Sequence, residues 1–285
     1  MADGSGRYFG IPEPDSERLQ GMRAELAADE PASYGESSRQ SVRDCLDRLL
    51  SEARTGDLTE AGARVSHLIA CVEALGPSAL EPRRGLAGLF DSRGGRLKRF
   101  RAAFQASSRT VRDSLADIDE RLGGVETRGR SIEGALDALR EAVREINGHL
   151  TVGRAAIAPP PAAAAEGEAA EDPELALRNR LKDLDHHRLT GVSALPGARA
   201  IQNADAWAAS ALRRAGPALQ AWQEDWTGRL GLDRKRPRKV RPDVAELSAS
   251  RDRLLAALSR IRAEVTQAQE RRQAQVSRLE ALRNG

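Results

Sequence analysis

The sequence predicts an all-α protein, and both its composition and the spacing of its apolar residues indicate this class. Only 3% of the 285 residues are aromatic, whereas 31% are charged. The apolar residues are largely Ala and Leu, which favour helices, and a sheet protein would need more bulky and β-branched side chains. Apolar residues also recur at steps of three and four over long segments. We therefore expect an elongated antiparallel coiled-coil helical bundle with a small helical N-terminal part.

The N-terminal part is predicted to be simple. Residues 1–35 begin with a Gly- and Pro-rich stretch that we expect to be largely disordered, followed by one short helix at Ser16–Ala28. Residues 36–80 predict a short helical hairpin, because two sets of apolar residues fall at the spacing of one helix face. These sets are Val42, Cys45, Leu46, Leu49 and Leu50, then Val65, Leu68, Ile69, Val72 and Leu75.

The segment at residues 81–153 is predicted to form one long coiled-coil helix. Between Leu97 and Leu150 the apolar residues alternate in steps of three and four, which gives the a and d positions of a heptad seam. Gly123, Gly124 and Gly129 interrupt this helix, and each costs roughly 1 kcal/mol relative to Ala. They indicate either a kink or a close helix crossing.

A Pro- and Ala-rich linker at residues 154–173 comes next, and the C-terminal helices at residues 174–285 are expected to pack back on the long helix. The predicted helices of this part are Glu174–Leu189, Ala200–Leu230 and Asp243–Leu282. Pro217 predicts a kink or a break in the second of them, because proline interrupts the helical hydrogen bonds. Arg251 and Arg272 occupy seam positions of the last helix and are expected to weaken its seam.

Charge and cysteine content limit the class of protein further. Lys and Arg total 45 against 42 Asp and Glu, so the net charge of +3 is too small to indicate nucleic-acid binding over the whole surface. Two cysteines do not suggest a disulfide framework, and we find neither a signal peptide nor an apolar segment long enough to span a membrane. We expect a cytoplasmic protein, with the periphery of the inner membrane as an alternative location.

No catalytic constellation stands out, so we expect neither an enzyme nor a cofactor. The sequence has none of the common serine-hydrolase, zinc-protease, thiol-redox or phosphate-loop motifs. His67 and Cys71 lie at i, i+4 on one predicted helix and could form a two-ligand clamp, with Cys45 as a further ligand. Because buried cysteine is usually inert core, we expect no metal site, and metalloid binding by these three residues is the weakest of the functions considered.

The densest positive run lies before the last predicted helix and is a candidate surface for anions. It consists of Arg234, Lys235, Arg236, Arg238, Lys239 and Arg241. Such a run can contact phosphates or an anionic membrane, and the contact would be weak, salt-sensitive and without sequence preference. The alternative, which we favour, is a solvated turn that binds nothing.

Several short motifs follow one another in a recognisable order after the linker. They comprise Arg180, Leu181, Asp183 and Leu184 in an RLxDL-like motif, then Pro196, Arg199, Gln202, Asn203 and Trp222. In this order, and over about Leu75 to Leu282, the chain resembles the toxic anion resistance family, the TelA-type tellurite resistance proteins. Where that family has an acidic residue followed by Asn in its long helix, this chain has Arg128-Gly129. The resemblance implies a role in resistance to toxic anions and defines no reaction.

The function that we expect from the sequence is a non-enzymatic cytoplasmic helical scaffold or adaptor, linked to resistance to tellurite or related toxic anions as part of a stress response. The alternative is a structural coiled-coil protein of envelope or chromosome organisation that binds phosphates through basic turns. The expected partners are other proteins, and the seams could also join copies of this chain. Sequence-specific nucleic-acid binding is not expected, and any membrane contact would be weak and peripheral.

Overall fold

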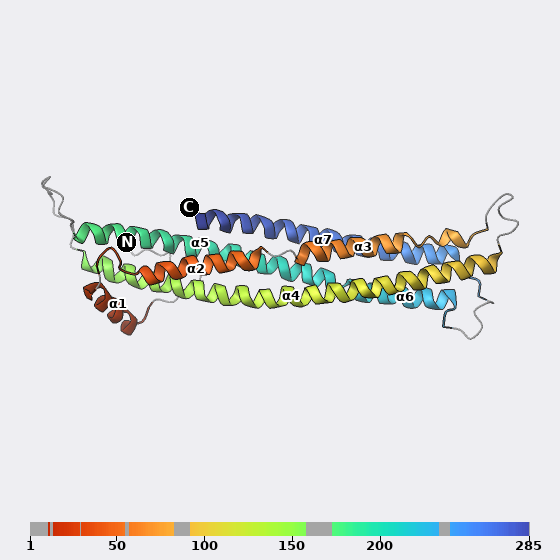
Figure 1. Ribbon diagram of the computed structural model, residues 1–285, viewed down its shortest axis with the longest axis horizontal. Helices are drawn as coiled ribbons and strands as arrows, with labels where there is room; N and C mark the ends of the chain where they lie inside the picture. The colour runs from red at the N-terminus through yellow and green to blue at the C-terminus, as the bar shows by residue number, and fades with distance from the viewer. Residues whose placement is uncertain are drawn as a thin grey trace. The chain divides into compact units, whose positions relative to one another are not determined.

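The computed structural model describes residues 11, 14–28, 30–54, 57–82, 92–157, 173–233 and 240–284. These residues form helices and turns without any β-strand, which confirms the predicted all-α class. In chain order the elements are α1 (Ser16–Ala28), α2 (Glu36–Ala53), α3 (Asp57–Glu73), the 3₁₀ helix η2 (Pro77–Leu80), α4 (Arg93–Ala156), α5 (Pro173–Arg213), α6 (Ala215–Leu230) and α7 (Val244–Asn284) (Figure 1). The predicted disordered start at residues 1–10 and residues 158–172 of the predicted linker lie outside the described residues.

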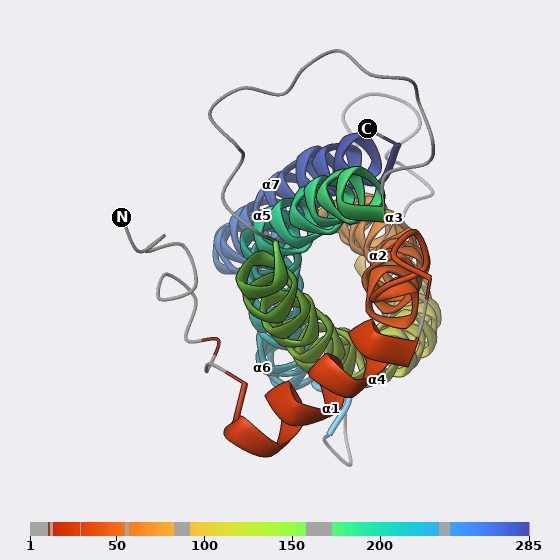
Figure 2. The same cartoon turned by 90° about the vertical axis from the view of Figure 1, so that its left-hand side faces the viewer.

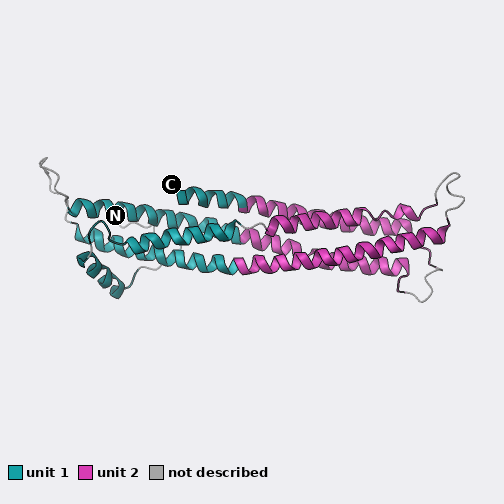
Figure 3. Cartoon of the chain, viewed as in Figure 1, with its two compact units in different colours: residues 1–54, 129–202, 273–285 teal, residues 55–128, 203–272 magenta. Residues whose placement is uncertain are grey.

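The chain divides into two compact units, and three of its helices contribute to both (Figure 3). Unit 1 consists of Met1–Arg54, Gly129–Gln202 and Gln273–Gly285, and unit 2 consists of Thr55–Arg128 and Asn203–Arg272. Unit 1 therefore holds α1, α2 and one part each of α4, α5 and α7. Unit 2 holds α3, η2, α6 and the remaining parts of those three helices. Each unit is thus a helical bundle made of segments far apart in the sequence.

The core of unit 1 lies between the apolar faces of α2, α4, α5 and α7. In the end view of Figure 2, α1 crosses obliquely on the outside of this bundle. Leu136, Leu139 and Leu184 are fully buried, and burial of each such side chain stabilises the fold by about 1.5–3 kcal/mol. Gly191 of α5 faces Val143 of α4, and a Cβ added there would lie 2.6 Å from Val143 Cγ2. The missing side chain therefore permits the close approach of these two helices.

The core of unit 2 contains an aromatic cluster between α4 and α6. Phe100 and Phe104 of α4 face Trp226 of α6 with ring centroids 5.7 and 5.5 Å apart, and Trp222 lies 5.0 Å from Trp226. Apolar residues of α3 and α7 pack around this cluster. The cluster thus holds four of the nine Phe, Trp and Tyr residues of the sequence, and their packing supplies much of the apolar area at this place in unit 2.

Local sequence signals explain where several helices begin and end. The carboxylate of Asp243 accepts a hydrogen bond from the backbone N–H of Ala245 at 2.9 Å, which caps the first turn of α7. Asp15 caps α1 in the same way through the N–H of Arg18, at 2.8 Å. Gly231 ends α6 in the left-handed conformation, with φ of 65°, which glycine adopts at little energetic cost.

The C-terminal helices differ from the prediction in where they break. A break was expected between Leu189 and Ala200, but α5 runs continuously from Pro173 to Arg213, through Pro196. Pro196 is exposed, so water can satisfy the carbonyl that loses its helical partner, and the buried residues on the other face hold the helix together. The break predicted near Pro217 instead falls at Arg214, between α5 and α6.

The longest described helix, α4, spans Arg93–Ala156 and includes the whole of the predicted seam at Leu97–Leu150. The glycines expected to kink it lie inside a continuous helix. A Cβ added at Gly123 or Gly129 would meet no atom of the described residues within 4 Å, so neither marks a close crossing between the described helices. A Cβ at Gly124 would lie 3.2 Å from Asp57 Oδ2 of α3, which makes it the one tight position of the three.

Candidate functional site

Arg180, the first residue of the RLxDL-like motif, joins three segments of unit 1. Its side chain is only 9% exposed. Its Nε donates a hydrogen bond to the carbonyl of Tyr34 at 2.7 Å, and its Nη2 donates to Glu36 Oε2 at 2.6 Å. Its Nη1 donates to Asp183 Oδ2 at 2.9 Å, within the same motif. A planar guanidinium can serve three acceptors in this way, and Arg180 thereby holds the turn before α2 against α5.

Glu36 is the acidic centre of this network and the first residue of α2. It accepts hydrogen bonds from Arg39 and Arg180, and these lower the pKa of Glu36 to about 2. A negative charge in the first turn of a helix also interacts favourably with the helix dipole. Leu181 and Leu184 of the motif lie in the core of unit 1, so the motif combines a polar anchor with apolar packing.

The turn that Arg180 holds places Tyr34 against His149 of α4. The two rings meet edge to face, with centroids 4.8 Å apart, and the Tyr34 hydroxyl donates to the carbonyl of His149 at 3.4 Å. Burial raises the pKa of Tyr34. Gly35 has φ of 68°, and a Cβ added there would lie 3.2 Å from the imidazole Cγ. Glycine is therefore required for both the turn and this contact.

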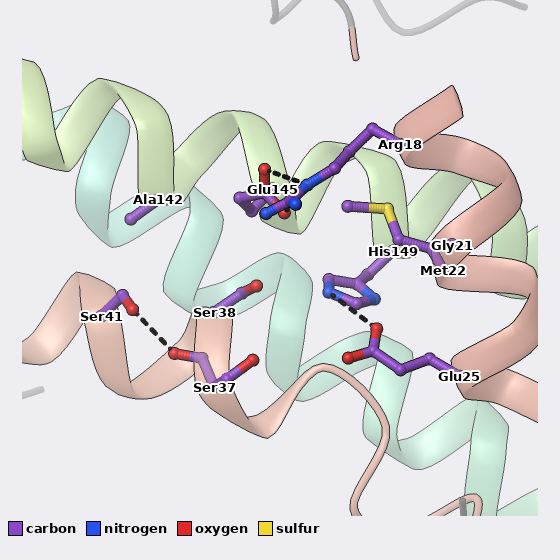
Figure 4. A pocket seen from close by; sticks show the side chains of 10 residues that line it. All are labelled: Arg18, Gly21, Met22, Glu25, Ser37, Ser38, Ser41, Ala142, Glu145 and His149. Atoms are coloured by element: carbon purple, nitrogen blue, oxygen red, sulfur yellow. Dashed lines mark hydrogen bonds and ion pairs between the residues drawn. The ribbon is translucent and has the colours of Figure 1, made fainter. Parts of the chain in front are cut away.

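A pocket of about 370 Å³ opens beside His149, between α1, α2 and α4 (Figure 4). On one side Arg18 Nε donates to both carboxylate oxygens of Glu145, at 2.8 and 2.9 Å. On the other side Glu25 Oε2 lies 3.8 Å from His149 Nε2. The α2 residues that line the pocket are Ser37, Ser38 and Ser41. These groups could hydrogen-bond a small polar molecule.

His149 is the buried titratable group of this pocket. The residue is 2% exposed, and its buried Nδ1 has no hydrogen-bond partner among the described residues. Burial lowers the pKa of His149, because the imidazolium loses its hydration, although Glu25 and Glu145 act in the opposite direction. The buried imidazole therefore favours its neutral form, because a proton on the ring would have to be held away from water.

A second polar network in unit 1 is built on two further motif residues of α5. Arg199 donates from Nη1 and Nη2 to the two carboxylate oxygens of Glu133 on α4, at 2.6 and 3.0 Å. Gln202 donates to Glu133 Oε2 at 3.0 Å and to the carbonyl of Gly129 at 3.1 Å. It also accepts from Arg199 at 2.8 Å, so the three side chains form a closed set. These contacts lower the pKa of Glu133.

A buried ion pair crosses the core of unit 2. Arg272 Nε of α7 lies 2.9 Å from Asp205 Oδ1 of α5, and their side chains are 9% and 5% exposed. Arg128 of α4 pairs with Asp57 of α3, and both charges influence the pKa values of the buried pair. Burial raises the pKa of Asp205 and lowers that of Arg272. The seam position that was expected to weaken α7 is thus matched by an opposite charge.

The remaining motif residues take structural positions. Trp222 is buried in the aromatic cluster of unit 2, where it also meets Phe104 edge to face at 5.4 Å. Gln223, next to it, donates to the carbonyl of Ser108 at 3.3 Å. Asn203 and Pro196 are exposed.

The candidate metalloid ligands are distributed over both units. His67 and Cys71 lie together on α3 in unit 2, with Cys71 Sγ 3.8 Å from His67 Nε2, whereas Cys45 belongs to α2 in unit 1. Burial raises the pKa of both thiols, which disfavours the thiolate that binds metals. Within the described parts of the chain, no three His, Cys, Asp or Glu side chains are arranged to hold a metal ion.

The structure describes one residue of the basic run. Arg234, Lys235, Arg236, Arg238 and Lys239 lie outside the described residues, and Arg241 is exposed just before α7. As far as the structure describes the chain, no helix has the length and apolar character needed to cross a membrane.

Sequence reasoning missed His149 and Asp205 as sites of interest. His149 lies next to the apolar seam residue Leu150, and Asp205 lies four residues after Ile201 on the inward side of a predicted helix. For Asp205, the signal in the sequence was that it occupies an inward-facing position of one helix while Arg272 occupies a seam position of another. For the first site the sequence offered no signal, because the partners come from three separate helices.

Comparison with known proteins places the chain in one family. The family model described as toxic anion resistance protein (TelA) matches residues 25–215, which is more than half of the chain. Trp222 and α7 lie beyond the matched residues. Protein KlaB of Escherichia coli is 24% identical over 223 residues, which cover 71% of this chain and 59% of KlaB. The chain therefore spans less than two thirds of that relative, and no solved structure matches it. On the family match, the chain belongs to the toxic anion resistance (TelA) family.

Proposed function

We propose that this protein is a non-enzymatic cytoplasmic scaffold or adaptor that supports resistance to tellurite or related toxic anions. Membership of the TelA family supports the link to toxic anions. Protein partners, and not a chemical step on the anion, would then provide the resistance.

The observation that carries the scaffold role is how the motif residues are used in unit 1. Arg180 joins α5 to α2, and Arg199 with Gln202 joins α5 to α4. The two sets form separate networks that hold helices at fixed positions, and they do not converge on one reactive centre. In an enzyme family, the motif residues would surround a substrate. In unit 1 they instead hold the helices in place.

The test is resistance of a deletion strain that carries variants of this gene. Arg180→Ala removes three hydrogen bonds and should lower both the melting temperature of the purified protein and survival on tellurite. Lys182→Ala is the matched control, because this cation is exposed on the same helix, and it should preserve both properties. The contrary outcome is a strain that survives tellurite as well as the wild type while its Arg180→Ala protein has a lowered melting temperature and is present at the normal level. That result would contradict a role for the motif in function.

A second experiment separates a scaffold from an enzyme. Glu25→Gln removes an exposed carboxylate from the polar pocket and should leave the melting temperature nearly unchanged. A scaffold retains resistance in this variant, and the purified wild-type protein leaves tellurite unconverted. Loss of resistance in a stable Glu25→Gln protein, or conversion of tellurite by the wild type, would favour catalysis at the pocket.

A further inference from the structure

α1 packs on unit 1 through one buried residue, Met22, and two partly buried leucines, Leu19 and Leu26. Met22 is its one buried residue, and it fits where Gly148 of α4 has no side chain, since a Cβ added there would lie 2.5 Å from Met22 Sδ. The pair between Arg18 and Glu145 holds one end of the helix. The Arg18 side chain is 61% exposed, so this pair contributes only about 0–1 kcal/mol. A helix attached in this way undocks at a lower free energy than the bundle helices.

The imidazole of His149 lies at the same contact. Tyr34 and Gly35 enclose one part of the ring, and Glu25 of α1 faces its Nε2. Figure 4 shows the ring between α1 and the start of α2. When α1 moves away, water reaches the Nε2 side of an imidazole that is now buried.

The charged side chains that act on the ring lie on α1, α4 and α5. Arg18 and Glu25 lie on α1, Glu145 on α4 itself, and Arg180 on α5. The two carboxylates favour the imidazolium and the two arginines disfavour it, whereas the Tyr34 hydroxyl is neutral. Burial outweighs the carboxylates, so the docked state binds a proton less readily than a hydrated imidazole does.

We propose that α1 is a latch that acidification releases, because protonation of His149 favours the state in which α1 has moved away from the ring. The docked state lowers the pKa of His149, so its advantage is complete above pH 6.5, the ordinary value, and declines as the pH falls below it. Release opens the serine-lined pocket between α2 and α4 and exposes the surface around Gly148.

Hydrogen–deuterium exchange of the full-length protein tests the latch. Exchange of residues 16–28 is measured at pH 7.5, 6.5 and 5.5 and corrected for the intrinsic effect of pH. We expect the corrected exchange rate of α1 to rise by up to about tenfold from pH 7.5 to 5.5, the limit set by one pH unit below the ordinary pKa. Exchange in the buried part of α7 should stay constant. Constant exchange of α1, or slower exchange at low pH, would overturn the proposal.

Three variants test whether His149 is the group whose protonation releases α1. His149→Phe keeps a planar ring and should make exchange of α1 independent of pH. Glu25→Gln removes a carboxylate that favours the imidazolium in the docked state, so release should increase further at pH 5.5, and this variant serves even if His149→Phe does not fold. Glu17→Gln makes the same charge change at an exposed position of α1 and should respond like the wild type. An equal effect of Glu17→Gln and Glu25→Gln would refute the role of His149.

Discussion

Replacing Arg272 by Met leaves the carboxylate of Asp205 without its partner in the core of unit 2. The Asp205 side chain is 5% exposed, so water cannot take over the solvation that the guanidinium provides. Breaking a buried ion pair from one side destabilises a protein by about 3–5 kcal/mol. At roughly 2–4 °C per kcal/mol, Arg272→Met should lower the melting temperature by roughly 6–20 °C.

Removing both charges should restore stability. The double variant Asp205→Leu, Arg272→Met replaces the pair by apolar side chains of similar size and should lie within about 1 kcal/mol of the wild type or above it. The loss in the single variant should also shrink as the pH is lowered from 7 towards 4. The reason is that the pKa of Asp205 is already raised by burial, and protonation removes the buried charge.

Urea denaturation followed by circular dichroism measures all of these proteins. Arg262→Met, at an exposed position of the same helix, is the control and should change the unfolding free energy by less than about 0.5 kcal/mol. A loss below about 1 kcal/mol in Arg272→Met, or a double variant as unstable as the single one, would show that the pair is not buried as described.

Three further predictions concern unit 1. Leu139 is fully buried, so Leu139→Ala should lower the unfolding free energy measured in urea by about 2–5 kcal/mol, and Leu139→Asp should lower it by more. An equal and small loss in both variants would place this residue outside the core. Gly191→Val should lower the melting temperature, because the new side chain would collide with α4. Gly134→Ala meets no described atom within 4 Å and should raise the unfolding free energy by about 1 kcal/mol. An unchanged melting temperature in Gly191→Val would argue against the close crossing of α4 and α5. Arg39 and Arg180 lower the pKa of Glu36 to about 2, so the part of the stabilisation that depends on the Glu36 charge should be complete above about pH 4.5 and be largely lost as the pH falls to about 2. A difference between Arg180→Ala and wild type that persists unchanged at pH 2 in thermal melts would contradict this.

Helix boundaries and core faces followed from the sequence wherever the signal was local. The apolar steps of three and four identified α2, α3, α4 and α7, and Ser16–Ala28 was predicted with the bounds that α1 has. These features depend on neighbours within one or two helical turns. Pro196 was harder to interpret, because its tolerance depends on whether that face of α5 is exposed, which is a tertiary property.

The candidate site required the tertiary structure. The sequence singled out Arg180 through its motif, but its acceptor Tyr34 lies 146 positions away, and Asp205 meets Arg272 from another helix. His149 became notable only because α1, the turn before α2 and α4 enclose it. Hydrophobic periodicity determines which side of a helix faces inward, and this the sequence contains by itself. Which polar side chains then meet depends on the relative register of helices that are distant in the chain, and only their packing decides it.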